Sequence, residues 1–290
     1  MRAQDEKVAP TRRPQKIHKD HTLLRLGLLA CLIAALLLLA AFPEEICPYD
    51  PYAQDLALSL QAPDTEHLLG TDRYGRDMLS RVIMGSQASI YASLALVAII
   101  ALTGTLVGLA AGMLGGWPDT LLMRFADTCL AFPGLVLALA VAAITGGGMV
   151  NAVLALAAIS WPKYARLARS QTLSLARQEF VQAARLAGTG PFMLAFRHIL
   201  PNGAGQIVIT AMLDIGTMMM ELAGLSFLGL GAKPPVAEWG SMMSVGRSML
   251  QTSPWTVLAP GAAIFLAVAL FNMFGDAVRD YFDVRGRRRS

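Results

Sequence analysis

Long apolar runs alternate with short polar segments along this chain. Several of the runs approach or exceed the about 20 residues that an α-helix needs to cross the hydrocarbon core of a membrane. Because these runs carry few charges, each of them predicts a membrane-spanning helix. The six predicted spans are Leu23–Phe42, Ser86–Leu114, Leu121–Ile144, Ala152–Leu167, Ile207–Leu230 and Val257–Val278.

The composition supports this interpretation. Hydrophobic residues make up 55% of the 290 positions and charged residues only 15%, whereas soluble domains average about 25% charged residues. The sequence therefore predicts an all-α, polytopic membrane protein with a single membrane domain over residues 23–290, preceded by a tail over residues 1–22. The fourth span is short and contains Trp161 and Pro162, so its end is the least sharply defined boundary.

The distribution of positive charge predicts the orientation of the spans. Of the 24 Lys and Arg residues, 19 lie in the first 25 residues, at Arg124, from Lys163 to Arg197, or from Arg279 onward. Such cations face the cytoplasm in membrane proteins. Both termini and the connection over residues 168–202 are therefore predicted inside, and residues 43–80 outside. The first span, at about 20 apolar residues, is long for a cleaved signal and is predicted to be an anchor.

Potential metal ligands do not gather in this sequence. Cys31 and Cys129 lie in predicted spans, and all four histidines lie outside the spans. Met218–Met220 offer soft thioether ligands, but methionine more often fills gaps between packed helices. We therefore expect neither a metal site nor a cofactor bound by this chain.

The second span carries Gly104, Gly108, Gly112 and Gly116 at a four-residue spacing. Glycines at this spacing form a smooth face on which another helix can approach closely. The partner would be either another helix of this chain or a helix of a second membrane subunit.

The fifth span carries two acids among its apolar residues. Each would cost about 2.5 to 3.5 kcal/mol in the membrane unless it faced water or a partner. At 100° per residue, Thr210, Asp214, Thr217 and Glu221 share one face of the helix. This face is predicted to line an aqueous path that favours cationic or amine-bearing cargo. Alternatively, the acids are protonated or paired and only hold helices together.

The stretch FVQAARLAGTGPFMLAFRHILPN interrupts the apolar pattern between the fourth and fifth spans. Helical spacing over Phe180–Ala187 predicts a short helix that Gly188 ends in a left-handed conformation. Thr189 is predicted to cap a second short helix, with Pro191 in its first turn and Pro201 at its end. Such a pair would be either a rigid element pushed from inside or an amphipathic loop lying on lipid.

The same stretch resembles a family signature. QAARLAG followed by HILP is similar to the EAA motif of ABC importer membrane subunits, with Gln182 in place of the usual Glu and His198 in place of Ile. The resemblance implies that the helix pair docks into a groove on a cytoplasmic ATPase and transmits its closure. The implied coupling residues are Gln182, Ala183, Ala184, Gly188, His198, Leu200 and Pro201.

Two further segments extend the resemblance over most of the chain. HLLGTDRYGRDMLSRVIMGSQASI and LSFLGLGAKPPVAEWGSMM are similar to segments of the peptide and nickel importer permeases. LDIGTMMMELAGLSFLGLG and FNMFGDAVRDYFDVR are more similar to the nickel branch. The resemblance implies a type I importer permease in a bacterial inner membrane that carries nickel or a nickel chelate, or alternatively a dipeptide or oligopeptide.

The resemblance also implies partners. A second permease would complete a heterodimer, two ATPase subunits would use ATP and Mg, and an external binding protein would deliver the cargo. Residues 43–80 would contribute to the surface facing that binding protein, or else form only a solvated connection.

Other function classes fit the sequence less well. The chain contains no Gly-Lys pair, so it has no phosphate-binding loop of the GxxxxGK[ST] type. An ion-coupled secondary transporter, the less favoured alternative, typically shows inverted repeats. A membrane enzyme would need a nucleophile with its base or a metal cluster. We therefore expect a permease subunit rather than an enzyme.

Overall fold

The computed structural model describes residues 18–286, so the predicted tail over residues 1–22 lies almost wholly outside the described residues. Helices account for most of the described chain and no strand occurs in it, apart from one isolated bridge between Thr71 and Asp77. The predicted all-α fold is confirmed. The long helices are α1 (His18–Ala41), α3 (Met78–Leu114), α4 (Gly116–Leu130), α5 (Gly134–Ile144), α6 (Met149–Leu175), α9 (Leu200–Phe227) and α11 (Trp255–Gly286).

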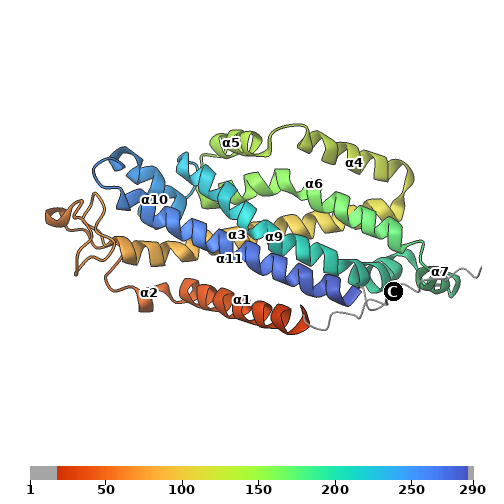
Figure 1. The fold of residues 1–290 in the computed structure, drawn as a ribbon. Helices are drawn as coiled ribbons and strands as arrows, with labels where there is room; N and C mark the ends of the chain where they lie inside the picture. The colour runs from red at the N-terminus through yellow and green to blue at the C-terminus, as the bar shows by residue number, and fades with distance from the viewer. Residues whose placement is uncertain (1–17, 287–290) are drawn as a thin grey trace, which may run out of the picture.

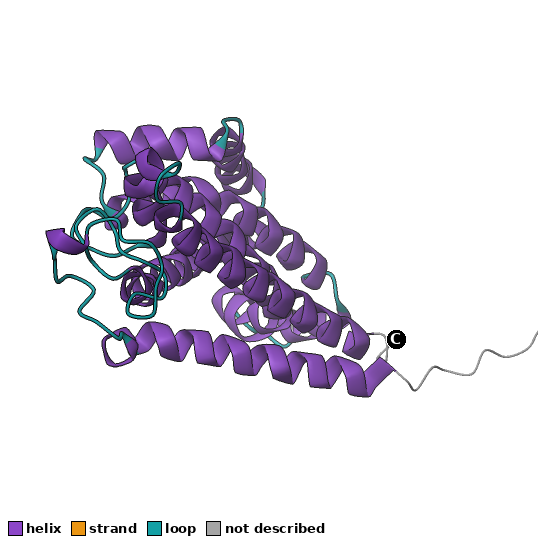
Figure 2. Ribbon diagram, turned by 60° about the vertical axis from the view of Figure 1, so that its left-hand side comes forward, coloured by secondary structure: helices purple, strands orange, loops and turns teal. Residues whose placement is uncertain are grey.

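Helices α3, α6 and α9 pack together and share one buried apolar cluster, which includes Leu96, Leu156 and Leu222. Helix α11 packs on α9, and α1 lies along one edge of the bundle against α11 and α3. Helices α4 and α5 lie on the opposite edge, beside α6 (Figure 1). The long helices other than α5 run roughly along one direction in Figure 1, and Figure 2 shows the bundle from a second side.

Among the described residues, four helical segments are long and apolar enough to cross a membrane: Leu23–Ala41, Met78–Leu114, Pro191–Phe227 and Trp255–Tyr281. They overlap the predicted first, second, fifth and sixth spans, although the predicted fifth span runs three residues beyond the end of its helix. Helix α6 contains the fourth, but it continues beyond the predicted end at Leu167 to Leu175. Pro162 lies inside it without ending it.

The third predicted span differs from the structure. Helices α4 and α5 meet at an angle of 87°, so Leu121–Ile144 is a broken pair rather than one straight helix. The break contains Pro133, which lacks an N–H and disfavours helical geometry at Phe132. The apolar content of this region was therefore predicted correctly, but its continuity was not.

The two ends of the bundle carry different structures. At one end, α1 begins, α11 ends and α7 (Glu179–Leu186) protrudes (Figure 1). The other end carries the long loop before α3, together with α10 (Trp239–Gly246). The segment that resembles the EAA motif and the predicted outer loop thus lie at opposite ends.

Candidate functional site

The segment that resembles the EAA motif, over residues 180–202, connects α6 to α9 and is largely exposed; this connection is called the hinge below. Helix α7 ends in a turn where the N–H of Thr189 donates to the carbonyl of Ala184. The turn contains Gly188, whose φ of +85° is the left-handed conformation predicted for it. Glycine therefore allows the chain to turn at this position without the steric cost that a side chain would add to the left-handed conformation.

The second half of this segment differs from the prediction. Thr189 does not cap a helix, because the N-cap position is Gly190 and no side chain bonds there. Beyond Pro191 the chain stays helical through α8 (Pro191–Met193), a π-helical stretch η2 (Leu194–Ile199) and α9. Pro201 does not end the second helix, because it lies just after the π-helical stretch and α9 continues through it to Phe227. Of the two short helices predicted in this segment, only α7 is separate among the described residues, and the second is an extension of the fifth span.

The inner face of α7 is packed, whereas its outer face is not. Val181 is fully buried against Leu194 and Ile199, and Ala184 and Leu200 pack at the edge of the same cluster. In contrast, Leu186 is 89% exposed, and Phe192 is also largely exposed. The remaining exposed apolar side chains on this surface are Phe180, Met193 and Phe196.

The predicted coupling residues fall into two groups. Gln182, Ala183, Gly188 and Pro201 are exposed, and Ala184, His198 and Leu200 are half-buried. The Gln182 side chain donates to the carbonyl of Ala176 at 2.7 Å, closing the turn between α6 and α7. Gln182 thus contributes to the shape of this surface.

The acids of the fifth span occupy different environments. Asp214 is only 4% exposed, and its carboxylate lies 2.5 Å from Lys163 Nζ on α6. It also accepts a hydrogen bond of 2.9 Å from the Tyr164 hydroxyl. For Asp214, therefore, the structure shows the paired arrangement that the sequence left open as an alternative.

The rest of the predicted polar face is more open. Thr217 is exposed, and Thr210 and Glu221 are half-buried on the same side of α9. The Lys163 side chain is 56% exposed, so this cation reaches the same open surface. In the sequence, Lys163 was counted with the cytoplasmic cations and its partner Asp214 was not predicted. The two residues lie 51 positions apart, so no local pattern indicates their contact.

Three of the four spaced glycines pack against α6. A methyl group on Gly104 would come 2.5 Å from Tyr164 Cβ, and one on Gly112 would come 2.7 Å from Thr172 Cβ. Gly108 lies against the Ala165 carbonyl and Ala168. The prediction is wrong for Gly116, which lies beyond the end of α3 as the first residue of α4 and has no described neighbour within 4 Å of such a methyl.

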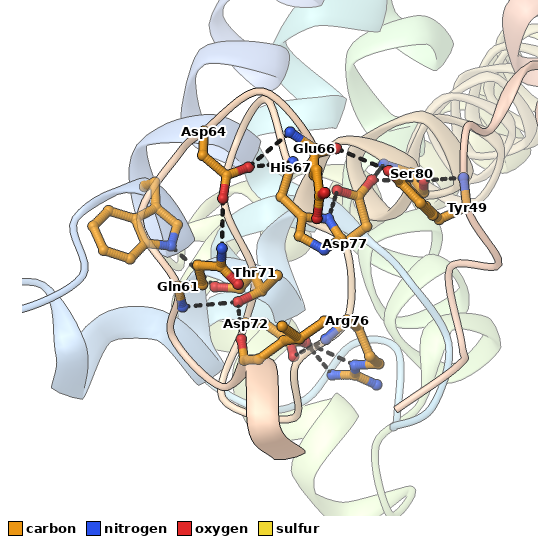
Figure 3. Close-up of polar contacts among 12 residues, drawn as sticks. Tyr49, Gln61, Asp64, Glu66, His67, Thr71, Asp72, Arg76, Asp77 and Ser80 are labelled. Atoms are coloured by element: carbon orange, nitrogen blue, oxygen red, sulfur yellow. Dashed lines mark hydrogen bonds and ion pairs between the residues drawn. The ribbon is translucent and has the colours of Figure 1, made fainter. Parts of the chain in front are cut away.

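The loop before α3 is held by its own hydrogen bonds (Figure 3). Asp77 caps α3 by accepting from the N–H of Ser80, and its other oxygen lies 2.9 Å from His67 Nδ1. Asp64 accepts from the N–H of His67, which lowers the pKa of the Asp64 carboxyl. The Trp255 ring donates to the Thr71 carbonyl at 3.0 Å, so the loop is anchored to α11.

Arg76 and Asp72 form a second cluster in this loop, with a 2.6 Å ion pair (Figure 3). Both side chains are buried. Together with the cap of α3, this pair explains why a loop rich in polar residues keeps a defined shape.

Comparisons with known proteins agree with this architecture. Residues 104–288 match the family described as the inner membrane component of binding-protein-dependent transport systems. The dipeptide transport system permease protein of Alkalihalophilus pseudofirmus is 40% identical over 276 residues, which cover 95% of this chain and 90% of that protein. The nickel transport system permease protein of Escherichia coli K12 is 40% identical over 256 residues, covering 88% of this chain and 92% of that protein.

A glutathione transport system permease protein of Pectobacterium atrosepticum is also similar, at 40% identity over 91% of this chain and 87% of that protein. Among solved structures, an inward-facing MetNI methionine ABC transporter matches with a TM-score of 0.53 and 18% identity, over 70% of this chain and 97% of that chain. This structural match supports the fold.

Proposed function

The chain belongs to the family of inner-membrane components of binding-protein-dependent transport systems, within the peptide and nickel group of ABC importer permeases, and we propose that it forms half of a translocation path. A second permease of the same fold would complete the path as a heterodimer. Two ATPase subunits would bind and hydrolyse ATP with Mg, and an external binding protein would deliver cargo to the end that carries the loop before α3.

The observation that carries this proposal is the apolar surface around the hinge. Leu186 and Phe192 are exposed on a segment whose inner face is tightly packed, so packing supports this surface from within and none of the described residues covers it. Exposed apolar surface of this kind typically marks a protein contact. We assign it to the ATPase. The end of the bundle that carries α7, together with the start of α1 and the end of α11, would then face the cytoplasm.

The contact can be tested with a matched pair of variants. Leu186→Ser removes an apolar side chain that is 89% exposed, and Ile144→Ser removes one that is 87% exposed at the end of α5. We expect Leu186→Ser to weaken association with the ATPase subunits in detergent, and Ile144→Ser to leave it unchanged. Equal association for both variants would contradict the assignment.

We propose a short peptide as the cargo. Asp214 is paired with Lys163, whose side chain is partly exposed, so the open face of α6 and α9 presents this ion pair and one further acid, Glu221, rather than two unpaired acids. Lys163 and Glu221 would then face the carboxylate and the ammonium group of a zwitterionic peptide. The similarity to dipeptide and glutathione permeases supports this choice.

Nickel or a nickel chelate is the second candidate. The fifth span is similar to the nickel branch in sequence, and a nickel permease is 40% identical to this chain. In this case Glu221 would favour the cation at the path wall.

Uptake by the reconstituted complex in liposomes separates the two candidates. We expect ATP-dependent uptake of labelled dialanine that unlabelled dipeptide suppresses, and that falls when Glu221 is changed to Gln. Uptake of radioactive nickel without uptake of dipeptide would select the second candidate. Uptake of either solute by this chain without ATPase subunits would refute the proposed function itself.

A further inference from the structure

A cavity of about 150 Å³ lies at the loop end of the bundle, between the loop before α3, the segment that follows α9, and α10. A cavity of about this volume can hold benzene, so this one can hold a small organic group. It lies apart from the Lys163 and Glu221 face, and neither residue lines it. Part of its wall is apolar, with Val236, Met242 and Val245.

The charged residues that line the cavity are unbalanced. The single acid is Asp72, and the four cations are Arg73, Arg76, Arg81 and Lys233. Asp72 is shared by Arg76 at 2.6 Å and Arg81 at 3.6 Å. Arg73 and Lys233 pair with no carboxylate among the described residues: Arg73 donates to the Tyr74 hydroxyl and Lys233 to the Gly146 carbonyl. The cavity wall is therefore strongly cationic, and such a concave surface attracts anions.

A buried hydroxyl provides a second and independent observation. Ser226 lines the cavity, is 1% exposed, and its Oγ has no hydrogen-bond partner among the described residues. A buried hydroxyl without a partner is costly, and most such groups in folded proteins are satisfied. An anionic ligand in the cavity would provide the missing acceptor.

We propose that this cavity binds the carboxylate group of a small solute. Lys233 and Arg73 supply the free positive charge, Ser226 Oγ donates a hydrogen bond, and the apolar wall holds a short aliphatic part. Arg76 and Arg81 contribute positive charge while they stay bound to Asp72. A carboxylate with a small aliphatic group fits both the volume and the mixed lining. Nothing in the family resemblance assigns a ligand to this cavity.

The test compares two probes that differ mainly in charge. N-acetylalanine carries the carboxylate, and N-acetylalanine amide is nearly the same shape without it. Binding to the purified permease complex in detergent is measured by isothermal titration calorimetry. We expect the acid to bind, with an affinity that falls as salt rises, and the amide to show no binding. Equal binding of the two probes would overturn the proposal.

Variants then locate the binding. Ser226→Ala should weaken acid binding about tenfold, which corresponds to about 1.4 kcal/mol, because the bound carboxylate would lose the Ser226 hydroxyl as a donor. Lys233→Met should also weaken binding and reduce its dependence on salt. Both changes are expected to leave the fold intact, since Ser226 Oγ has no partner and Lys233 is exposed.

Thr105→Ala is the matched control. Thr105 Oγ1 is also buried without a partner, but it lies among α3, α6 and α9, away from this cavity. Its removal should leave binding of the acid unchanged. Wild-type affinity in Ser226→Ala would overturn the proposal. Failure of the wild-type complex to bind the acid would also overturn the proposal. If Lys233→Met then weakened docking of the external binding protein, the cavity would serve a protein partner instead.

Discussion

The packing of α3 on α6 makes a quantitative prediction for Gly108. In the structure, a methyl group on Gly108 would lie 2.8 Å from Ala168 Cβ and against the Ala165 carbonyl. Carbon atoms in favourable contact are about 3.5 to 4.0 Å apart, so Gly108→Ala requires α3 and α6 to separate by about 1 Å. Overpacking of this kind costs about 1–3 kcal/mol. Backbone atoms supply part of the contact, so a change of side-chain rotamer cannot relieve it.

Gly27→Ala is the matched control. Gly27 lies in α1 and has no neighbour within 4 Å of an added methyl group. Both substitutions gain about 1 kcal/mol of helix propensity, so their difference reports the packing cost alone. We therefore expect Gly108→Ala to be less stable than Gly27→Ala by about 1–3 kcal/mol.

The assay is unfolding of the purified protein by SDS in mixed micelles, followed by tryptophan fluorescence. If both variants unfold at the same SDS fraction, the close approach of α3 and α6 at Gly108 is wrong. A lower midpoint for Gly108→Ala alone would support it.

Three further predictions concern the ion pair, the loop and the hinge. Asp214→Asn should lower stability by about 1–3 kcal/mol because Lys163 loses its acid, and adding Lys163→Met should restore part of that loss in the same assay. The lowered pKa of Asp64 means that its contribution is complete above the usual Asp pKa of about 3.9 and is lost as pH falls through the lower folded value. The protection of the His67 amide against hydrogen exchange, measured as the ratio of its intrinsic to its observed exchange rate at each pH, should therefore fall in acid, and Asp64→Asn should abolish that fall. Gly188→Val should lower stability by about 1–2 kcal/mol and reduce ATP-driven uptake, because backbone strain at φ +85° opposes the substitution even though there is space for the side chain. Gly188→Asn should largely retain uptake. Equal uptake by the two variants would contradict a role for this conformation.

Sequence reasoning succeeded where a local pattern determines the structure. Apolar runs located most of the helices, and the left-handed conformation of Gly188 follows from residues on either side of it. The break at Pro133 also has a local signal, since proline disfavours a continuous helix, but the high apolar content on both sides outweighed that signal in the prediction. Gly116 was predicted to belong to the glycine face because it continues the four-residue spacing. Helix α3 ends before it, and spacing alone does not mark a helix end.

Contacts between residues that lie far apart in the sequence could not be predicted from local patterns. The four residues predicted to share a polar face of α9 differ in exposure, and the pairing of Asp214 with Lys163 depends on how α6 packs. The cavity near Ser226 combines the loop before α3 with α10, which lie more than 160 residues apart in the sequence. No sequence window contains both walls, so the excess of cations there became apparent only in the fold.

The contacts of α6 determine how movement at the hinge would reach the membrane helices. The glycine face holds α6 against α3, and the Asp214 pair ties it to α9. At the hinge, Val181 packs with Leu109 of α3 and Ile199. A push on α7 therefore acts on α3, α6 and α9 together. Since α1 and the broken pair of α4 and α5 lie on the two edges of this core, we expect relative movement at those edges and little change across the Gly108 contact.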